Sequence, residues 1–377
     1  MKKHSMIVLI ILLTVFILAL SGCGGGNQSA SQGSSSTGFA ERPEFVWRMQ
    51  VIHNPGQSDF EQNVKTAEEI YIASNGRLKI EVHPNGTFVG SMEGFQACGD
   101  GVFEMHSSWP VYARGIEYAL LPLSTGNMTM DAVDKYVWLY EHGGWEIMQK
   151  AFDKLNLQFI AAEVWGTEVL MANEPFKTIE EMRGKTFRTS DPRLLEKNGV
   201  AAITLPLEEV FTGLATGAVD MAEFGNLDYN VGLGLTDVTK YGIWPDFWNV
   251  HFVTTVVVNK DAWNQLPPDL QMIVKLGFQA REFQHLTKSQ YRSAIAMNEL
   301  EQQAKMEFIR MSEEQWPKMR AQMYEIELED IKTHGGLTRE ALESKHEFMK
   351  LWYPYKDISR WWGWGLTPEE MAGFELD

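Results

Sequence analysis

The stretch from Gly184 to Phe224 constrains the fold most, because it alternates β-rich runs with amphipathic ones. Short β-rich runs are expected at residues 185–188, 201–205 and 219–224. A helix start is expected at residues 189–192, where polar residues precede Pro192, and a helix at 207–216, with Gly217 as its end. This order, joined by short loops, predicts an open α/β sheet. In such sheets, ligands bind at the carboxyl ends of the strands.

Arg188 ends the first of these strands, next to the expected helix start. The positive end of a helix and a guanidinium together favour an anion. Arg188 is therefore the candidate residue for holding an anionic ligand, and the resemblance described below implies that this anion is a carboxylate, to which a guanidinium donates two parallel hydrogen bonds. The alternative is a structural ion pair with a nearby acid, for which Glu163, Glu168 and Asp191 are the candidates.

Three segments together resemble one family: GKTFR from Gly184, EVFTGLATGAVD from Glu209, and VVVNKDAWNQLP from Val256. They are similar to the solute-binding proteins of TRAP transporters, the DctP family, over about residues 45–355, and most of all to the branch that binds 2-oxo acids and lactate. The resemblance implies a two-lobed α/β fold of the type II periplasmic-binding-protein kind, with hinge strands and a long C-terminal helix. It also implies that the protein captures a small organic acid, a monocarboxylate of the 2-oxo or hydroxy acid kind, and delivers it to the TRAP membrane subunits without converting it.

Residues 1–22 are interpreted as a lipoprotein signal peptide. Lys2 and Lys3 precede an apolar run, and Leu20-Ser21-Gly22-Cys23 matches a lipobox, in which Cys23 is lipidated. The alternative is a membrane-spanning helix, but the apolar run of about 15 residues is short of the roughly 20 that a span needs. Residues 23–40, rich in Gly, Ser and Gln, are expected to be a flexible tether. The folded part would then lie on the periplasmic or extracytoplasmic face, held to a membrane by its lipid.

Two lobes are expected from a mature length of roughly 350 residues. Lobe I is assigned to residues 41–163 and 252–290, and lobe II to residues 164–251. The long β-branched run at 249–259 is long enough to return from lobe II to lobe I, so two crossing strands would form a hinge that closes around a ligand.

The C-terminal region, residues 291–377, is expected to be helical and to pack across both lobes or on a partner subunit. A helical run of about 65 residues is predicted from Pro267, followed by a break at Gly335-Gly336 and a helix at 338–351. A tail with four tryptophans follows, Trp352, Trp361, Trp362 and Trp364. Two interpretations stay open: a homodimer that buries helix and tail, or a tail that folds back on its own core.

Composition excludes several classes of function. The net charge is −17, which argues against nucleic acid and against anionic lipid surfaces. Besides Cys23 the only cysteine is Cys98, so an internal disulfide is not expected. The sequence contains no GxSxG, HExxH, GxxxxGK[ST] or post-strand GxGxxG motif. A surface-anchored hydrolase and a ligand sensor for a signalling receptor are the rival classes.

The remaining candidate ligand-binding residues lie at predicted strand ends or crossings. They are Trp109, Tyr112, Trp165, Thr167, Glu223, Phe224, Asn226, Trp248 and Asn249. Several of the aromatic rings would form an apolar box and favour a monocarboxylate with an apolar or aromatic tail, although core packing explains such rings equally well.

A cation beside the ligand is implied only by the resemblance. In that branch, the acidic and aromatic residues at the positions of Glu223 and Phe224 help to hold Na⁺ or Ca²⁺ beside the carboxylate. The same branch has Trp-His-Glu-Pro-Gly further on, where this chain reads Phe247-Trp248-Asn249-Val250-His251. The second acidic ligand is therefore missing, which puts the metal in doubt.

Overall fold

The computed structural model describes residues 42–125, 129–244 and 251–358. The leader, the tether, Cys23 and the tail after Ile358 lie outside these residues, as do Trp248 and Asn249. Within them, no helix is both long enough and apolar enough to cross a membrane.

The first sheet has five strands, three of which come from the N-terminal third of the chain. Its order is β2 (Leu78–His83), β1 (Phe45–Val51), β3 (Met105–Ser108), β10 (Val253–Asn259) and β4 (Leu157–Val164). Strand β1 runs parallel to both β2 and β3, and β10 runs antiparallel to β3 and β4. Every residue of β10 is buried, which explains why its sequence is a continuous β-branched run rather than an alternating one.

Helices cover both faces of this sheet. On one face lie α2 (Ser58–Ala73), α10 (Lys260–Gln265) and α11 (Pro268–Gln302), whose Ile70, Trp263 and Phe278 join one core cluster. On the other lie α3 (Gly94–Gly99), α4 (Leu120–Ser124), α5 (Ala132–Glu141), α6 (Gly144–Asp153) and α13 (Gly336–Ile358). A short 3₁₀ helix, η1 (Pro110–Ala113), follows β3.

The second sheet has six strands. Its order is β11 (Glu307–Arg310), β9 (Tyr241–Trp244), β5 (Leu170–Ala172), β8 (Met221–Ala222), β6 (Thr186–Arg188) and β7 (Ala201–Ile203). Strand β6 is parallel to β7 and β8, as the stretch from Gly184 predicts. Its helices are α7 (Arg193–Lys197), α8 (Leu207–Thr216), α9 (Leu227–Gly232) and α12 (Trp316–His334), with 3₁₀ turns η2 (Glu180–Met182), η3 (Leu235–Asp237) and η4 (Glu313–Gln315). Helix α8 has the predicted bounds and ends at Gly217, whose φ of 72° suits glycine.

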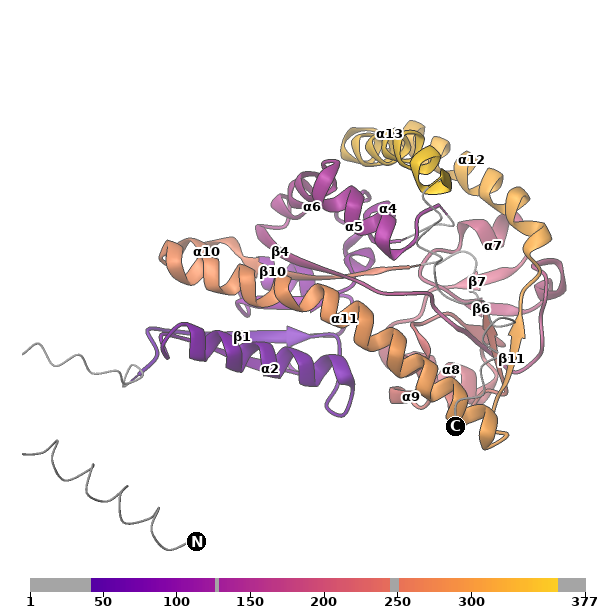
Figure 1. The fold of residues 1–377 in the computed structure, drawn as a ribbon, viewed down its shortest axis with the longest axis horizontal. Helices are drawn as coiled ribbons and strands as arrows, with labels where there is room; N and C mark the ends of the chain where they lie inside the picture. The colour runs from indigo at the N-terminus through magenta and orange to yellow at the C-terminus, as the bar shows by residue number, and fades with distance from the viewer. Residues whose placement is uncertain (1–41, 126–128, 245–250, 359–377) are drawn as a thin grey trace, which may run out of the picture. The chain divides into compact units, whose positions relative to one another are not determined.

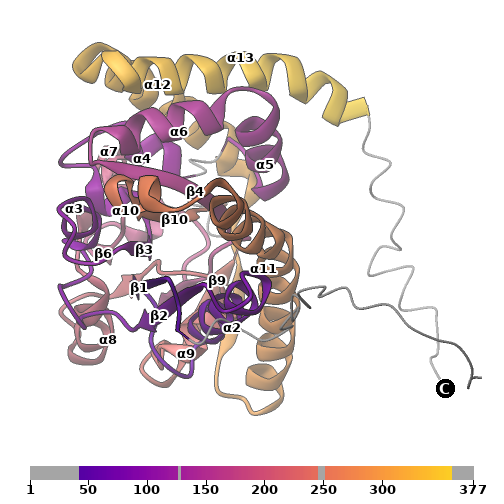
Figure 2. The same cartoon turned by 90° about the vertical axis from the view of Figure 1, so that its left-hand side faces the viewer.

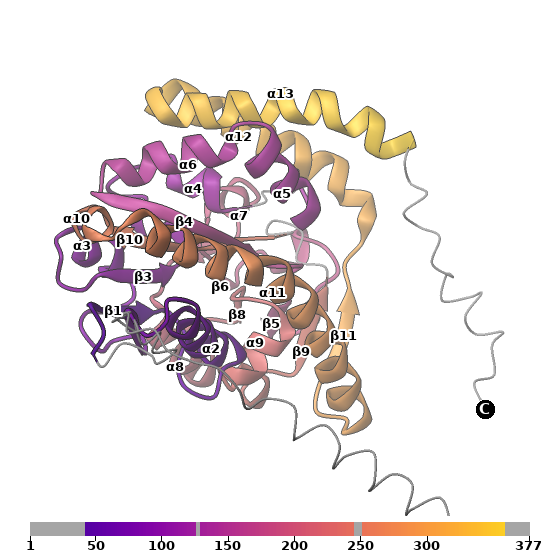
Figure 3. The ribbon, with the colours of Figure 1, turned by 60° about the vertical axis from the view of Figure 1, so that its left-hand side comes forward.

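Two lobes built on these two sheets confirm the expected fold class. The chain passes between them four times: from β4 to β5, from β9 to β10, along α11 to β11, and from α12 to α13. Helix α11 is 35 residues long and runs from the first sheet to α9 of the second lobe. Figure 3 shows its end followed by β11, which pairs with β9.

The predicted helical run of about 65 residues is wrong, because the run is divided into helix α11, strand β11, the turn η4 and helix α12. Helix α11 ends at Gln302, Ala304 takes a φ of 51°, and β11 then pairs in parallel with β9 before α12 begins. The pairing of β11 with the sheet edge outweighs local helix propensity. Helices α5 and α6 are likewise separate, because Gly143 divides them with a φ of 81°.

Helices α12 and α13 together contact both lobes. Helix α12 packs on α7, where the Asn198 side chain donates to the Gln322 side-chain oxygen at 2.9 Å. Helix α13 lies over α6 and α4 (Figure 2) and extends past its predicted end to include Trp352, whose Nε1 donates to Asp134 of α5 at 2.7 Å. Trp352 therefore packs back on its own chain.

Candidate functional site

Arg188 lies at the end of β6, in the middle of three parallel strands, and is 3% exposed. Its Nη1 donates to the Glu223 carbonyl oxygen at 2.8 Å, and its Nε and Nη2 donate to the Leu205 carbonyl oxygen at 3.3 and 3.1 Å. These bonds use three of the five N–H groups of the guanidinium. One N–H on each terminal nitrogen remains available, and this arrangement can bind a carboxylate through two parallel hydrogen bonds.

The alternative of a structural ion pair for Arg188 finds no support among the described residues. Two of the acids considered pair with other cations: Glu163 with Arg281, and Asp191 with Arg193. No ion pair between Arg188 and a carboxylate occurs in the described part of the chain.

A small cavity lies in front of this guanidinium, between the lobes. Of the predicted residues it is lined by Trp109, Tyr112, Arg188, Glu223 and Phe224. The remaining lining residues are Val111, Ser124, Thr125, Glu168, Ser190, Phe252 and Val253. Its volume is about 20 Å³, room for about one water molecule. A larger molecule enters only when the lobes move apart, which the crossing strands allow.

Trp109 is the centre of the aromatic wall. It directly follows β3, and its ring centroid lies 5.5 Å from that of Tyr112, 5.2 Å from Phe224 and 5.8 Å from Phe252. The Trp109 Nε1 and the Tyr112 hydroxyl are both buried and have no hydrogen-bond partner among the described residues. Burial raises the pKa of Tyr112 to about 12 although Arg188 lies close to it, so the hydroxyl is a neutral donor. Because both residues line the cavity, these two groups are available to donate to an acceptor bound there.

Glu223 is 1% exposed and organises the loop after Arg188. Its Oε2 accepts a hydrogen bond from the Thr189 hydroxyl at 2.9 Å. Its Oε1 accepts two from Ser190, one from the backbone N–H at 2.9 Å and one from the hydroxyl at 2.8 Å. The carboxylate thus fixes residues 189–191, which follow the anchor arginine directly.

The family of the chain follows from comparison with known proteins. A model of the family described as bacterial extracellular solute-binding protein, family 7, DctP, matches residues 51–330. The chain belongs to this family. The recognition made from the sequence is therefore confirmed, and the family is one of extracellular solute-binding proteins rather than of enzymes.

Individual relatives agree with this assignment. The chain is 26% identical over 250 residues to a monocarboxylate 2-oxoacid-binding periplasmic protein of a Nostoc species, covering 66% of this chain and 69% of that protein. A TRAP transporter solute-binding protein of Bordetella bronchiseptica, solved as a dimer with calcium and picolinate, superposes with a TM-score of 0.78 at 18% identity, covering 85% and 96% of the two chains. A TRAP periplasmic solute-binding protein of Pseudoalteromonas atlantica, solved with sodium and pyruvate, gives a TM-score of 0.77 at 18% identity, covering 88% and 99%. These two structures show that the fold is shared.

Three predicted residues of this DctP protein do not line the cavity. Trp165 is fully buried behind Phe252, on which its ring stacks at 4.9 Å, and its Nε1 donates to Thr254. Thr167 lines a separate groove with Trp244 and Met297. Asn226 caps α9 by accepting from the Tyr229 backbone N–H at 3.0 Å. Their assignment to the ligand stays a prediction, and Trp248 and Asn249 lie outside the described residues.

Sequence reasoning did not assign several lining residues to the site. Ser190 was interpreted only as part of a helix start and Glu168 only as an ion-pair alternative, although both line the cavity. Ser124 and Thr125 end α4, a five-residue helix with no amphipathic signal of its own. The one usable signal was proximity in sequence, because Ser190 follows Arg188 by two residues.

The described residues do not fit a metal centre of protein side chains. No group of three or more His, Cys, Asp and Glu side chains is placed to hold an ion in the described ranges. Both oxygens of Glu223 already accept hydrogen bonds from Thr189 and Ser190. Phe224 offers only a backbone carbonyl, and Glu168 is the one further carboxylate that lines the cavity. Ca²⁺ prefers six to eight oxygen ligands, so the side chains of the described residues alone do not complete such a shell.

A buried ionic cluster lies where α11 crosses the hinge strand β4. Arg281 of α11 pairs with Glu163 of β4, and His285 pairs with Asp59 of α2 at 2.9 Å. Glu282 accepts from the Tyr140 hydroxyl at 2.5 Å, and burial raises its pKa to about 7. These contacts join α11 to the hinge strand β4 and to α2.

Proposed function

We propose that this chain is the solute-binding protein of a TRAP-type secondary transporter and captures a small monocarboxylate between its lobes without turning it over. The observation that carries the proposal is the Arg188 guanidinium, buried at a strand end with one N–H free on each terminal nitrogen. A carboxylate that accepts both would be held in a fixed orientation.

The ligand class is narrowed by the donors beside Arg188. The Trp109 Nε1 and the Tyr112 hydroxyl are buried without partners and line the same cavity. A keto or hydroxyl oxygen next to a carboxylate would accept from them, which favours a 2-oxo or hydroxy acid. The matched Nostoc relative, described as binding monocarboxylate 2-oxoacids, supports this choice.

The rest of the ligand would meet apolar surface. Val111, Phe224, Phe252 and Val253 line the cavity, and Arg188 is the only arginine that does so among the described residues. A second carboxylate would face Glu168 or Glu223 instead of a cation. An apolar or aromatic tail is therefore favoured over a dicarboxylate.

The protein would work at a membrane surface. A lipid on Cys23, with residues 23–40 as a tether, would hold the folded part on the extracytoplasmic side, near the TRAP membrane subunits. The net charge of −17 would repel the protein from anionic lipid, so the lipid anchor would be the means of attachment.

A homodimer through α11 is part of the proposal. This helix carries exposed apolar side chains at Met272, Leu276, Phe283, Tyr291 and Ile295, of which Phe283 and Tyr291 are 72% and 71% exposed. The spacing places them along the face turned away from the core. A second copy of the same helix, in a symmetric contact, would cover this face.

Calorimetric titration of the full-length chain tests the proposed function. Pyruvate and lactate should bind more tightly than propionate, which lacks the second oxygen, and than succinate, which adds a carboxylate. Pyruvate recovered after incubation should be chemically unchanged by NMR. Tighter binding of succinate than of pyruvate would contradict the monocarboxylate assignment, and conversion of pyruvate would contradict a pure binding role. Loss of pyruvate uptake on deletion of the gene separates transport from sensing.

A further inference from the structure

The loop at residues 189–191 follows the anchor Arg188 and is held from outside its own lobe. Within its lobe, Glu223 accepts hydrogen bonds from Thr189 and Ser190, and Ser190 lines the ligand cavity. A change in the position of this loop would therefore move the cavity wall and the end of β6 together.

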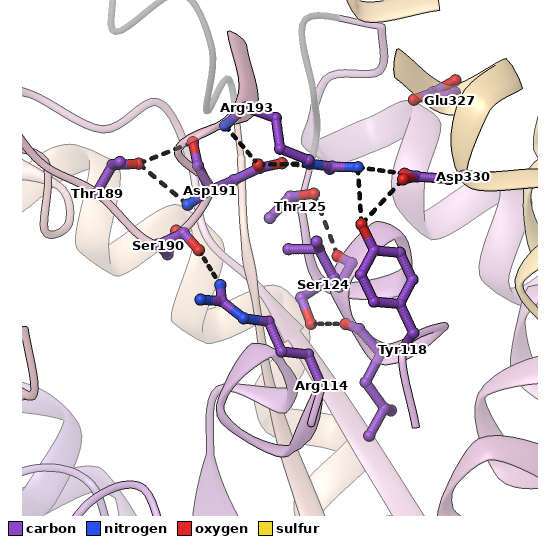
Figure 4. A network of polar contacts seen from close by, with 12 residues as sticks. Arg114, Tyr118, Ser124, Thr125, Thr189, Ser190, Asp191, Arg193, Glu327 and Asp330 are labelled. Carbon is purple, nitrogen blue, oxygen red and sulfur yellow. Dashed lines mark hydrogen bonds and ion pairs between the residues drawn. The ribbon is translucent and has the colours of Figure 1, made fainter. Parts of the chain in front are cut away.

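Lobe I reaches this loop through Arg114. Arg114 lies directly after η1, the turn that carries Tyr112. Its Nη1 donates to the Ser190 carbonyl oxygen, and its Nη2 donates to the Thr204 hydroxyl at 3.4 Å. Figure 4 shows the guanidinium directed at Ser190 from the opposite lobe. Because Arg114 belongs to lobe I and Ser190 to lobe II, this contact would break if the lobes moved apart.

The C-terminal helix α12 holds the same loop through Arg193. The Arg193 Nε donates to the Asp191 carboxylate at 2.7 Å, and its Nη1 pairs with Asp330 of α12. The Tyr118 hydroxyl of lobe I accepts from Arg193 at 3.2 Å and donates to Asp330 at 2.9 Å (Figure 4). One guanidinium thus joins lobe II, lobe I and α12.

Burial makes the contacts of this network costly to break. The side chains of Asp191 and Asp330 are each 8% exposed, and that of Arg193 is 19% exposed. Burial alone would raise the pKa of Asp191, but Arg193 and Arg114 outweigh it and hold that pKa below its usual value. A buried charge that loses its partner is costly, so the loss of one contact in this network would cost more than the loss of an exposed ion pair.

We propose that Arg114 and Arg193 are positioning residues that clamp the 189–191 loop in the closed state and so couple ligand capture to α12. This inference rests on the proposed function, because the loop carries the cavity wall beside Arg188. Neither residue lines the cavity. Substitution of Arg114 or Arg193 would make the bound carboxylate dissociate faster without deleting any ligand contact. A shift of the 189–191 loop would also change the contact of Arg193 with Asp330 on α12.

Three variants separate this role from a general loss of stability. Tyr118→Phe deletes one hydroxyl and keeps the ring, Arg114→Gln deletes the contact from lobe I, and Arg193→Lys keeps the charge but loses the planar fork. The matched control is Arg48→Gln, since Arg48 pairs with Glu104 at 2.8 Å inside lobe I alone. Arg193→Ala is avoided, because it would leave Asp191 and Asp330 buried without a cation.

The measurements are backbone hydrogen exchange on the full-length chain without ligand, and the dissociation rate of pyruvate by stopped-flow tryptophan fluorescence. In the three variants, exchange at residues 189–191 and the pyruvate off-rate should each rise about tenfold, while amides of β1 and β3 stay unchanged. Arg48→Gln should leave both values at wild type.

Unchanged loop exchange in all three variants would overturn the proposal, as would an equal rise in Arg48→Gln. If the loop exchange rises in the three variants but pyruvate does not bind the wild-type chain, the clamp stands and the proposed ligand is wrong.

Discussion

The guanidinium carbon of Arg188 lies 4.3 Å from the centre of the Phe224 ring. The ring covers one face of the guanidinium, and the Leu205 and Glu223 carbonyls fill its inner edge. The side chain is therefore fixed by main chain and aromatic surface rather than by an acid. A cation held in this way keeps its charge available for an anion at the remaining edge.

Substitution of Arg188 should weaken ligand binding in a graded way. Arg188→Lys keeps the charge but loses the fork, so the Kd for pyruvate should rise about tenfold, and Arg188→Ala should raise it about 100-fold. Calorimetry measures both. Arg183→Lys, on an exposed arginine of the same lobe, is the control and should leave the Kd unchanged. Wild-type affinity in Arg188→Ala would show that the anchor lies elsewhere.

The Trp109 Nε1 and the Tyr112 hydroxyl should donate hydrogen bonds to the keto or hydroxyl oxygen of the ligand. Trp109→Phe and Tyr112→Phe keep the rings and delete the polar groups that lack partners. The ratio of pyruvate affinity to propionate affinity should fall about fivefold in each, because propionate never used those donors. Titration of both ligands gives the ratio. Equal losses for pyruvate and propionate would mean that the rings act only by packing.

Acid should destabilise the fold through His106. Its Nδ1 faces the Gln50 carbonyl oxygen at 2.8 Å and must donate to it, while its Nε2 is buried without a partner. Burial lowers its pKa to about 4, so the folded state binds fewer protons than the unfolded one below pH 6.5. Stability should therefore be present above pH 6.5 and fall as pH drops towards 4, by about 3 kcal/mol in all.

The check for this pH effect is urea unfolding at pH 7.5 and pH 5 of the wild-type chain and of His106→Gln, which keeps a donor but cannot titrate. The variant should lose less stability on acidification. Glu282, whose pKa burial raises to about 7, acts with the opposite sign, so the difference between the two proteins is the quantity to compare. Parallel pH dependence in both would exclude His106 as the cause.

Chelation should have little effect on ligand binding. The described residues hold no group of three or more acidic, His or Cys side chains placed for an ion, and Glu223 is occupied by its own loop. The Kd for pyruvate should stay within about twofold after dialysis against EDTA. A loss of affinity that CaCl₂ restores, or a lower affinity in a buffer in which K⁺ replaces Na⁺, would contradict this expectation and direct attention to Glu168 and Glu223.

The α11 face should govern assembly. Sedimentation of the full-length chain in mild detergent should give a dimer, and Phe283→Glu should give a monomer, because it buries a charge in the proposed contact. Ile72→Glu, at a side chain 63% exposed on α2, is the control and should remain dimeric. A monomeric wild-type chain at micromolar concentration would rule the dimer out.

The sequence by itself determined the elements whose signals are local. The α8 bounds follow from Pro206 and Gly217, and the position of Arg188 follows from a β-rich run that stops before a polar turn. The strands β6, β7 and β8 pair as a parallel unit, as the alternating pattern predicts. These features depend on backbone preferences that act within a few residues.

Only the tertiary structure decided which side chains meet across the lobes. Trp165 and Trp109 both follow buried strands, yet Trp165 packs into the core while Trp109 lines the cavity. Strand β11 forms because β9 offers an open edge, which no local pattern near Glu307 reveals. The contacts of Arg114 with Ser190 and of Arg193 with Asp330 span 76 and 137 residues. The first pair exists because the two lobes close on each other, and the second because α12 packs on α7. Neither geometry is encoded in any one stretch of sequence.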